Sequence, residues 1–180
     1  MKKQGINPYP NEYEVTDCSS EIKEKHSKLS NDERTKDHVK IAGRVMTKRD
    51  LGKLAFVSLQ DSKGRIQLIF QSEETKKESL DLFKKYVDSG DFIGCEGIVM
   101  KTRTGEISVL VKNMELLSKS IFPLPEKFHG IQDDEERLRK RYLDIVMNPE
   151  VKELFIKKSK FWQTIRSFLL ENGFLEVETP

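Results

Sequence analysis

The chain has 180 residues, of which 36% are hydrophobic and 34% are charged, and its 32 Lys and Arg side chains nearly balance 30 Asp and Glu. That length holds one ordinary domain and part of a second, because compact domains usually have about 100–150 residues. The formal net charge of +2 argues against a protein that coats nucleic acid by bulk electrostatics, so a polyanionic partner would need a local basic patch.

Several classes of protein are disfavoured by the absence of their sequence signals. Apolar runs are only a few residues long, whereas a transmembrane helix needs about 20, and residues 1–13 lack the apolar centre of a signal peptide. We therefore expect a cytoplasmic protein without membrane contact. Cys18, Cys95 and the three histidines show no metal-ligand spacing, so we expect free thiols and no metal site. Phosphate-loop, nucleophile-elbow and HExxH motifs are also missing, so no complete catalytic site is predicted.

Residues 1–36 are predicted to be an N-terminal arm, because they are rich in Asn, Pro, Ser and mixed charge, with a short helix expected at 21–29. From Val39 apolar and polar residues alternate, which indicates a half-buried strand. Period-two patterns, turn residues and one stripe at helical spacing define the remaining elements of residues 37–117. These are strands at 55–60 and 65–71, a helix at 73–87, and strands at 91–103 and 106–112.

The order of three strands, a helix and two strands is that of the OB-fold, a five-stranded barrel that binds oligonucleotides. Residues 118–147 are predicted to be a linker, with a helix at 132–145 whose acidic residues precede its basic ones. Residues 148–180 begin with a long helix that Asn148 caps and Gly173 ends. Its apolar stripe is too large for the small barrel to cover, so we expect a further domain or a second subunit against it.

Strand parity predicts which side chains face outward from the barrel. Val57 and Leu59 point inward, so Phe56 projects outward, and Gln67 lies one diagonal step away across the hairpin. The basic loop expected at 48–53, which carries Lys48, Arg49 and Lys53, adds cations for phosphate. An aromatic platform, an amide, a carboxylate and such cations are the parts of a single-stranded nucleic-acid site. The candidates are Phe56, Gln67, Glu106, Arg49 and Arg65. Two alternatives stay open: the arm or another domain covers Phe56, and Gln67 and Glu106 are ordinary solvated side chains.

Eight runs of the sequence together match the pattern of a known family. They lie at 42–49, 56–61, 64–68, 90–94, 101–108, 123–130, 139–144 and 173–180. From about residue 5 to its last residue the chain resembles the N-terminal part of class II lysyl-tRNA synthetase. The first three runs are shared with aspartyl- and asparaginyl-tRNA synthetases, whereas Lys-Phe-His-Gly at 127–130 and Arg-Tyr-Leu-Asp at 141–144 favour lysine.

The resemblance implies a mainly β fold plus helices: an anticodon-binding OB-fold barrel, a linker, and the first helix and strand of an α+β class II catalytic domain. In the family, the position of Phe56 stacks on the central anticodon uridine, and those of Gln67 and Arg49 bond to that base or its neighbours. The position of Glu106 contacts the first anticodon base. The final helix and strand resemble motif 1, which forms much of the homodimer interface. Its expected residues are Phe161, Ile165, Phe168, Gly173 and Pro180.

The activity implied is that of lysine–tRNA ligase, which joins lysine to its tRNA with ATP through a lysyl-adenylate, using ATP and magnesium in the full-length enzyme. Motifs 2 and 3 are not present in these 180 residues, so we expect no bound cofactor and no catalysis by this span alone. Three alternatives remain: a freestanding OB-fold module that binds single-stranded RNA or tRNA, the equivalent region of an aspartyl- or asparaginyl-tRNA synthetase, and a scaffold protein that uses its helix for association.

Overall fold

A computed structural model describes residues 6–122, 124–125 and 133–179, and the chain divides into two compact units, Met1–Leu124 and Pro125–Pro180. Most of the run at 123–130, and Pro180 at the end of the motif 1 run, lie outside the described residues. Each unit is a separate structure with its own packing. In the described part of the chain, no helix is both long enough and apolar enough to span a membrane.

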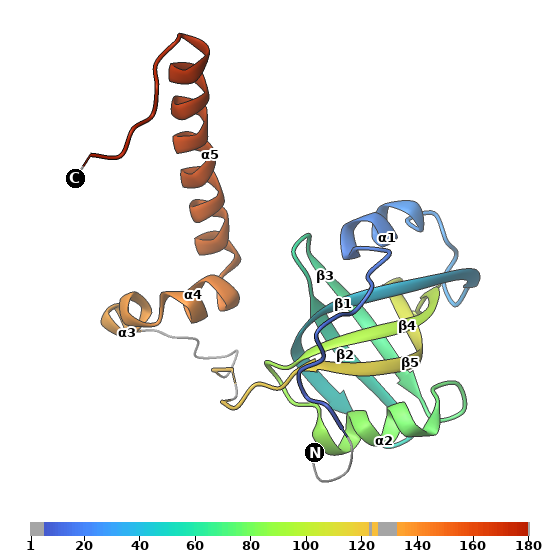
Figure 1. The fold of residues 1–180 in the computed structure, drawn as a ribbon. Helices are drawn as coiled ribbons and strands as arrows, with labels where there is room; N and C mark the ends of the chain where they lie inside the picture. Colours follow the sequence, from blue (N-terminus) through green and yellow to red (C-terminus); the bar gives the residue numbers. More distant parts are fainter. Residues whose placement is uncertain (1–5, 123, 126–132, 180) are drawn as a thin grey trace. The chain divides into compact units, whose positions relative to one another are not determined.

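The first unit is a closed five-stranded barrel (Figure 1). Its strands are β1 (Arg34–Asp50), β2 (Leu54–Gln60), β3 (Arg65–Gln71), β4 (Phe92–Lys101) and β5 (Ile107–Ser118). They close in the order β1-β2-β3-β5-β4, and only the β3 and β5 pair is parallel. A helix, α2 (Lys77–Tyr86), connects β3 to β4. This is the OB-fold that the strand order predicts.

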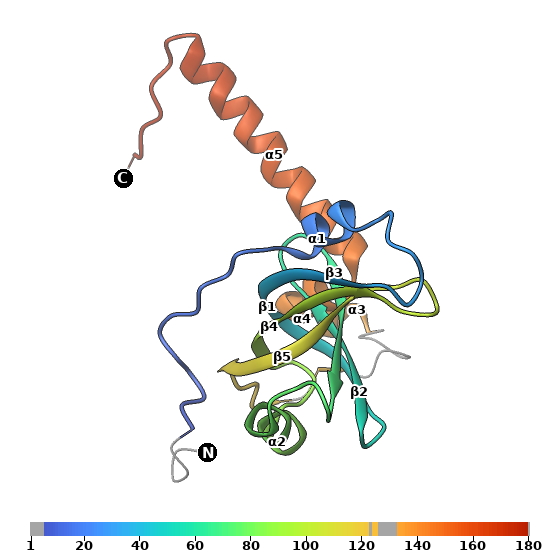
Figure 2. The same ribbon diagram turned by 90° about the vertical axis from the view of Figure 1, so that its right-hand side faces the viewer.

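The barrel interior follows the alternation of the sequence. Val57 and Leu59 of β2 are buried, as are Ile66 and Leu68 of β3. Helix α2 covers one end of the barrel (Figure 2), where the Phe83 ring of α2 stacks on that of Phe70 with centroids 4.1 Å apart. The parity prediction for these two strands is confirmed, and it fixes which of their side chains face outward.

Lys48 belongs to the packing of α2 and not to a phosphate-binding loop. Its Nζ lies 4.6 Å from the centroid of the Phe83 ring and donates hydrogen bonds to the carbonyl oxygens of Phe83 (3.1 Å) and Val87 (2.8 Å). The free carbonyls at a helix C-terminus attract a cation. Burial lowers the pKa of Lys48, although nearby carboxylates oppose the shift. The expectation that every cation of the loop between β1 and β2 is available to a ligand is therefore wrong.

The N-terminal arm packs against the barrel through a short helix, α1 (Ser19–Lys25). The backbone N–H and the hydroxyl of Ser19 donate to the Asp61 carboxylate at 2.6 and 2.7 Å, and Ile22 is buried in the barrel core. Burial raises the pKa of Asp61, but hydrogen bonds from Ser19 and from the turn amides of Lys63 and Gly64 outweigh it and hold the pKa below its usual range. The carboxylate therefore joins α1 to the β2–β3 turn.

The second unit contains α3 (Asp134–Arg139), α4 (Arg141–Met147) and α5 (Pro149–Glu171). The single helix expected at 132–145 is two helices, because the backbone of Lys140 leaves helical geometry with φ −110° and ψ 45°. Asn148 precedes α5, but its side chain makes no capping hydrogen bond and donates to Asp144 Oδ1 at 2.6 Å. Asp144 also accepts from Arg137 (3.3 Å) and Arg141 (2.8 Å). This buried carboxylate thus joins the three helices at one corner.

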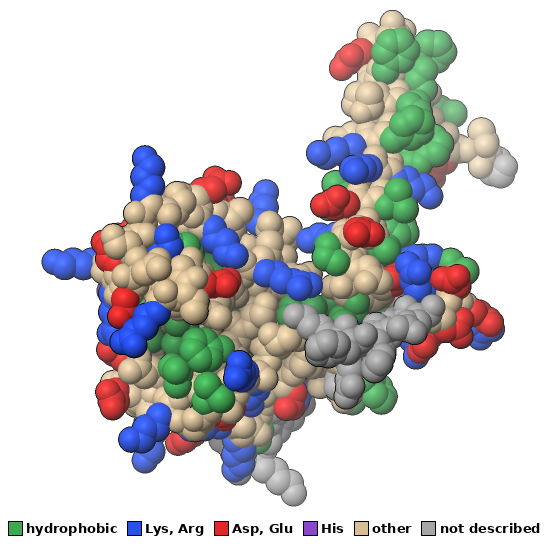
Figure 3. All heavy atoms as spheres, turned by 180° about the vertical axis from the view of Figure 1, so that it is seen from behind, with side chains coloured by type: hydrophobic (Ala, Val, Ile, Leu, Met, Phe, Trp, Pro, Cys, Tyr) green, Lys and Arg blue, Asp and Glu red, His purple; other side chains and the backbone are tan. Residues whose placement is uncertain are grey.

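Helix α5 has no buried residue, although it is 23 residues long. Its apolar side chains form a stripe along one side of the helix (Figure 3). Phe161 and Phe168 are 60% and 62% exposed, and Ile165 and Trp162 are exposed as well. The helix ends before Gly173, whose φ of +82° is the left-handed geometry that favours glycine after a helix.

Candidate nucleic-acid interface

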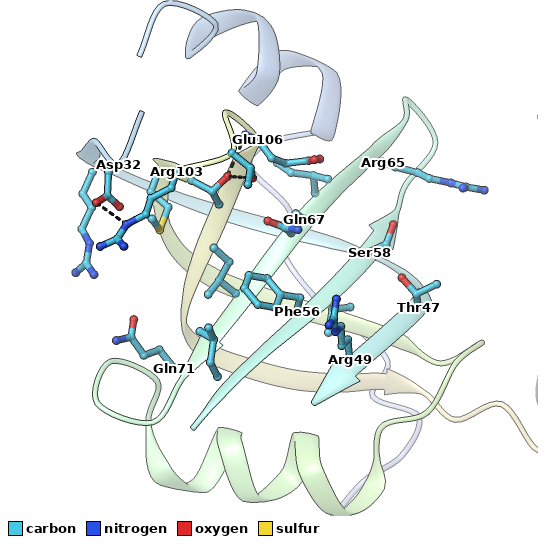
Figure 4. A pocket seen from close by; sticks show the side chains of 18 of the residues that line it. Asp32, Thr47, Arg49, Phe56, Ser58, Arg65, Gln67, Gln71, Arg103 and Glu106 are labelled. Carbon is cyan, nitrogen blue, oxygen red and sulfur yellow. Dashed lines mark hydrogen bonds and ion pairs between the residues drawn. The ribbon is translucent and has the colours of Figure 1, made fainter. Parts of the chain in front are cut away.

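A cavity of about 950 Å³ lies on the outer wall of the barrel (Figure 4). It is at the upper end of the range of about 300–1,000 Å³ that small-ligand sites occupy. Its walls come from α1, from β1 to β3, and from the turn between β4 and β5. All five residues that parity and the basic loop single out line it: Arg49, Phe56, Arg65, Gln67 and Glu106. The fold thus brings together residues that are up to 57 positions apart in the sequence.

Phe56 is the aromatic surface of the cavity. Strand β2 directs its ring outward between the buried Ala55 and Val57. The ring is half-buried because it packs against a small cluster on the outer wall formed by Ile69, Met100 and Leu110. One part of the ring is therefore supported from below, and the rest borders the cavity (Figure 4). The described part of the N-terminal arm, residues 6–36, leaves this part of the ring open to the cavity.

The Gln67 side chain is held by a buried hydroxyl. Ser108 Oγ lies 2.9 Å from Gln67 Oε1, so the hydroxyl donates and the amide oxygen accepts. Ser108 itself is fully buried on β5, which pairs with β3 at this position. Within the described residues the Gln67 amide nitrogen has no partner, so its N–H groups remain available to a ligand. Such a donor complements the carbonyl oxygen of a pyrimidine.

Glu106 supplies the acidic group at another side of the cavity. It follows the Thr102–Gly105 turn, and its nearest cation is Lys23 of α1, with Nζ 4.0 Å from Oε1. Both side chains are partly exposed. An ionised carboxylate only accepts hydrogen bonds, so Glu106 complements a base that presents an N–H.

Basic residues outnumber acidic ones around the cavity. Six cationic and three acidic side chains line it, which is the local basic patch that a nearly neutral chain would need in order to bind a polyanion. Arg65 donates to Gln60 Oε1 at 2.7 Å. The Arg49 guanidinium and the Lys53 ammonium group have no hydrogen-bond or ion-pair partner among the described residues. They are the cations best placed to contact phosphate.

Local sequence patterns do not identify two further lining residues, Lys23 and Arg103, or Ser108, which holds Gln67. Lys23 reaches the cavity only because α1 docks on the barrel, and no local pattern predicts that contact. Arg103 pairs with Asp32 at 3.2 Å across the same cavity, again through the arm. Ser108 has a usable signal, because it alternates with the inward Ile107 and Val109. Across the described ranges, no group of three His, Cys, Asp or Glu residues is placed to hold a metal ion.

A closed five-stranded barrel with an aromatic ring, an amide and free cations around one outer cavity places this unit in the OB-fold class, a class that includes modules for single-stranded nucleic acid. Comparison with known families agrees with this fold class. Residues 39–117 match the model described as OB-fold nucleic acid binding domain, and residues 133–180 match that of class II tRNA synthetases (D, K and N).

Curated relatives narrow the class further. The chain is 43% identical to the lysine–tRNA ligase of Halalkalibacterium halodurans, in a match that covers all of this chain and 36% of the relative. Identity is 46% with the enzyme of Staphylococcus epidermidis (98% of this chain, 36% of the relative) and 44% with that of Methanoculleus marisnigri (100% and 35%). The chain thus spans about a third of these relatives. It corresponds to the N-terminal portion of the class II lysyl-tRNA synthetase family, as the resemblance implies.

Proposed function

We propose that this chain is the anticodon-binding part of a lysine–tRNA ligase, an enzyme that uses ATP to attach lysine to its tRNA through a lysyl-adenylate. The observation that carries the proposal is the assembly of Phe56, Gln67, Glu106 and two arginines around one outer cavity. The similarity to lysine–tRNA ligases supports the choice of tRNA as the partner.

Each side chain has a distinct task in this proposal. The Phe56 ring stacks on an unpaired base, a contact that contributes about 1–3 kcal/mol. The Gln67 amide nitrogen donates to a carbonyl oxygen of that base, because the amide oxygen of Gln67 already accepts from the Ser108 hydroxyl. Glu106 accepts from the N–H of a neighbouring uridine, which cytidine lacks at the same ring position. Arg49 and Arg65 neutralise backbone phosphates and fix the register of the strand.

The rest of the chain is proposed to follow the family's organisation. Residues 1–36 form the arm, 37–117 the barrel, 118–147 the linker and 148–180 the start of the catalytic domain. We propose that the exposed stripe of α5 contributes to a homodimer interface through Phe161, Ile165 and Phe168, continued by Gly173 and Pro180. The exposure of the three apolar side chains supports this assignment.

ATP and magnesium belong to the activity of the full-length enzyme. The described residues contain no cluster suited to a metal ion, so we assign no step of the ATP chemistry to them. We also propose a cytoplasmic location, where tRNA is charged. A freestanding RNA-binding module would explain the barrel, but it would leave the stripe of α5 without a role.

The test is replacement of Phe56 by Ala, with binding measured on an RNA hairpin that carries the lysine anticodon. We expect binding to weaken by about 1–3 kcal/mol, with a nearly unchanged melting temperature, because the ring is only half-buried. Phe92→Ala is the matched control, since Phe92 is a partly exposed phenylalanine of the same barrel that does not line the cavity. A large loss of stability without loss of binding would contradict the proposal.

A further inference from the structure

The arm forms part of the cavity wall, as well as a connection to the barrel. Two of its residues, Lys23 and Asp32, line the cavity, and each faces an oppositely charged residue near the β4–β5 turn. Helix α1 is held at one end by the Ser19 hydrogen bonds to Asp61. Past its other end, Lys101 Nζ donates to the Leu29 carbonyl oxygen at 2.8 Å. The position of Lys23 is therefore set by packing on both sides.

Two hydrogen bonds hold the backbone of Glu106, whereas its side chain has one ion-pair partner among the described residues. Thr102 N–H donates to the Glu106 carbonyl oxygen at 2.9 Å, and Glu106 N–H donates to Thr102 Oγ1 at 3.0 Å. Gly105 closes the turn with a φ of +86°. Among the described residues, only Lys23 lies within ion-pair distance of the carboxylate, with an N–O separation of 4.0 Å. The direction in which Glu106 points thus depends on α1.

We propose that Lys23 is a specificity-determining positioning residue of the RNA site: it holds the Glu106 carboxylate directed at the base that Glu106 contacts. The inference rests on the proposed function and extends it, because it makes the N-terminal arm part of base selection. The neighbouring cation Arg103 is paired with Asp32 at 3.2 Å, which leaves Lys23 as the cation that faces Glu106.

The effect of the pair grows when RNA binds. In the free protein the side chains of Lys23 and Glu106 are 42% and 49% exposed, and such pairs contribute little in water. A base stacked on Phe56 excludes water from the same cavity, which strengthens the attraction between the two charges. A carboxylate oxygen held in this direction repels a base whose facing ring atom is an acceptor. Lys23 therefore acts on discrimination between bases more than on overall affinity.

The test compares the full chain with its Lys23→Ala variant on four RNA hairpins: one with the lysine anticodon and three in which each anticodon uridine in turn is replaced by cytidine. We expect the ratio of affinities for uridine and cytidine to fall by about threefold to tenfold at one position and to stay unchanged at the other two. Lys23→Arg should retain the ratio. Lys28→Ala, which removes an exposed lysine just beyond α1 that does not line the cavity, should leave it unaffected.

A second comparison separates positioning from other roles. In a Glu106→Ala background, Lys23→Ala should no longer alter discrimination, because the carboxylate it directs is gone. An equal loss of affinity for all four hairpins, with a salt dependence reduced by about 0.7 in slope, would make Lys23 a plain phosphate contact and would overturn the inference. If Phe56→Ala weakens binding while Lys23→Ala leaves every ratio intact, the inference fails and the proposed function stands. If Phe56→Ala has no effect, the proposed function itself fails.

Discussion

The two units of the chain differ in how much of their apolar surface they bury. In the barrel, the apolar faces of five strands close on one another, and side chains such as Phe70, Leu59 and Phe83 are fully buried. In the second unit, α5 carries an apolar stripe of comparable composition, yet none of its residues is buried. Among residues 133–179 the buried residue is a carboxylate, Asp144.

The first unit thus buries its own apolar faces, whereas the stripe of α5 lies exposed within the described residues. Within the first unit the arm and α2 complete the core of the barrel, and the cavity opens on its outer wall. The unit that contains α5 leaves its largest apolar face exposed, and an exposed face of this kind marks an interaction surface. Similar hydrophobic patterns in a sequence can therefore indicate a core in one segment and an interface in another.

The largest expected difference between the two units is in the effect of removing a phenylalanine ring. Phe70→Ala should lower the free energy of unfolding by about 3–5 kcal/mol, because it removes a fully buried ring that stacks on Phe83. Phe161→Ala on α5 deletes the same atoms from a site that is exposed in the monomer, so the free energy of unfolding of the monomer should change by less than about 0.5 kcal/mol. Urea unfolding followed by circular dichroism measures both. Equal losses would show that α5 is as well packed as the barrel.

A smaller effect is expected from the carboxylate that joins the arm to the barrel. Asp61→Ala should destabilise the barrel by about 1–2 kcal/mol, since it removes the acceptor for Ser19 at the start of α1. Asp133 caps α3 in the second unit by accepting from the Glu135 N–H. Asp133→Ala is the control and should leave barrel unfolding unchanged in the same urea titration.

The same carboxylate predicts a pH dependence. The pKa of Asp61 is lower in the folded chain than in the unfolded one, so its contribution to stability is fully present above its unfolded pKa of about 3.9. The contribution is lost as pH falls through the lower folded pKa. The difference in unfolding free energy between the wild type and Asp61→Asn should therefore shrink as the pH is lowered from 5 toward 2. A difference that stays constant over about this range would show that Asp61 does not titrate with folding.

The smallest effect concerns salt. Arg49→Ala should reduce the slope of log affinity against log salt by about 0.7 for a single-stranded RNA, because one phosphate contact is lost. Lys158→Ala removes a similar charge from exposed α5 and should leave the slope unchanged. Titrations of the lysine anticodon hairpin at several salt concentrations give both slopes. An equal reduction by both variants would mean that RNA contacts the second unit as well.

Local patterns predicted most of the barrel but few of its long-range contacts. Alternation in β2 and β3 identified the inward side chains, and the outward position of Phe56 followed from them. The same approach placed Lys48 in a phosphate-binding loop, whereas its ammonium group caps α2, some 35 residues further along the chain. It also missed Lys23, because the docking of α1 depends on Asp61, which lies 42 residues from Ser19.

The second unit shows the limit of helical patterns. The stripe of α5 was predicted together with its need for a partner, since a helix period is a local property. The helical pattern did not predict the break at Lys140 or the hydrogen bond between Asn148 and Asp144. Both arise where three helices meet around a buried carboxylate. Side-chain partners of this kind depend on packing, which periodicity does not describe.

The central claim is that the outer wall of the barrel binds an unpaired anticodon and distinguishes its bases. The most direct measurement is a titration of the chain with two RNA hairpins, one carrying the lysine anticodon and one the aspartate anticodon, at two salt concentrations. We expect the lysine hairpin to bind more tightly, by about tenfold or more, at both concentrations, because base contacts persist when phosphate contacts are screened. Equal affinities that fall together with added salt would contradict the central claim.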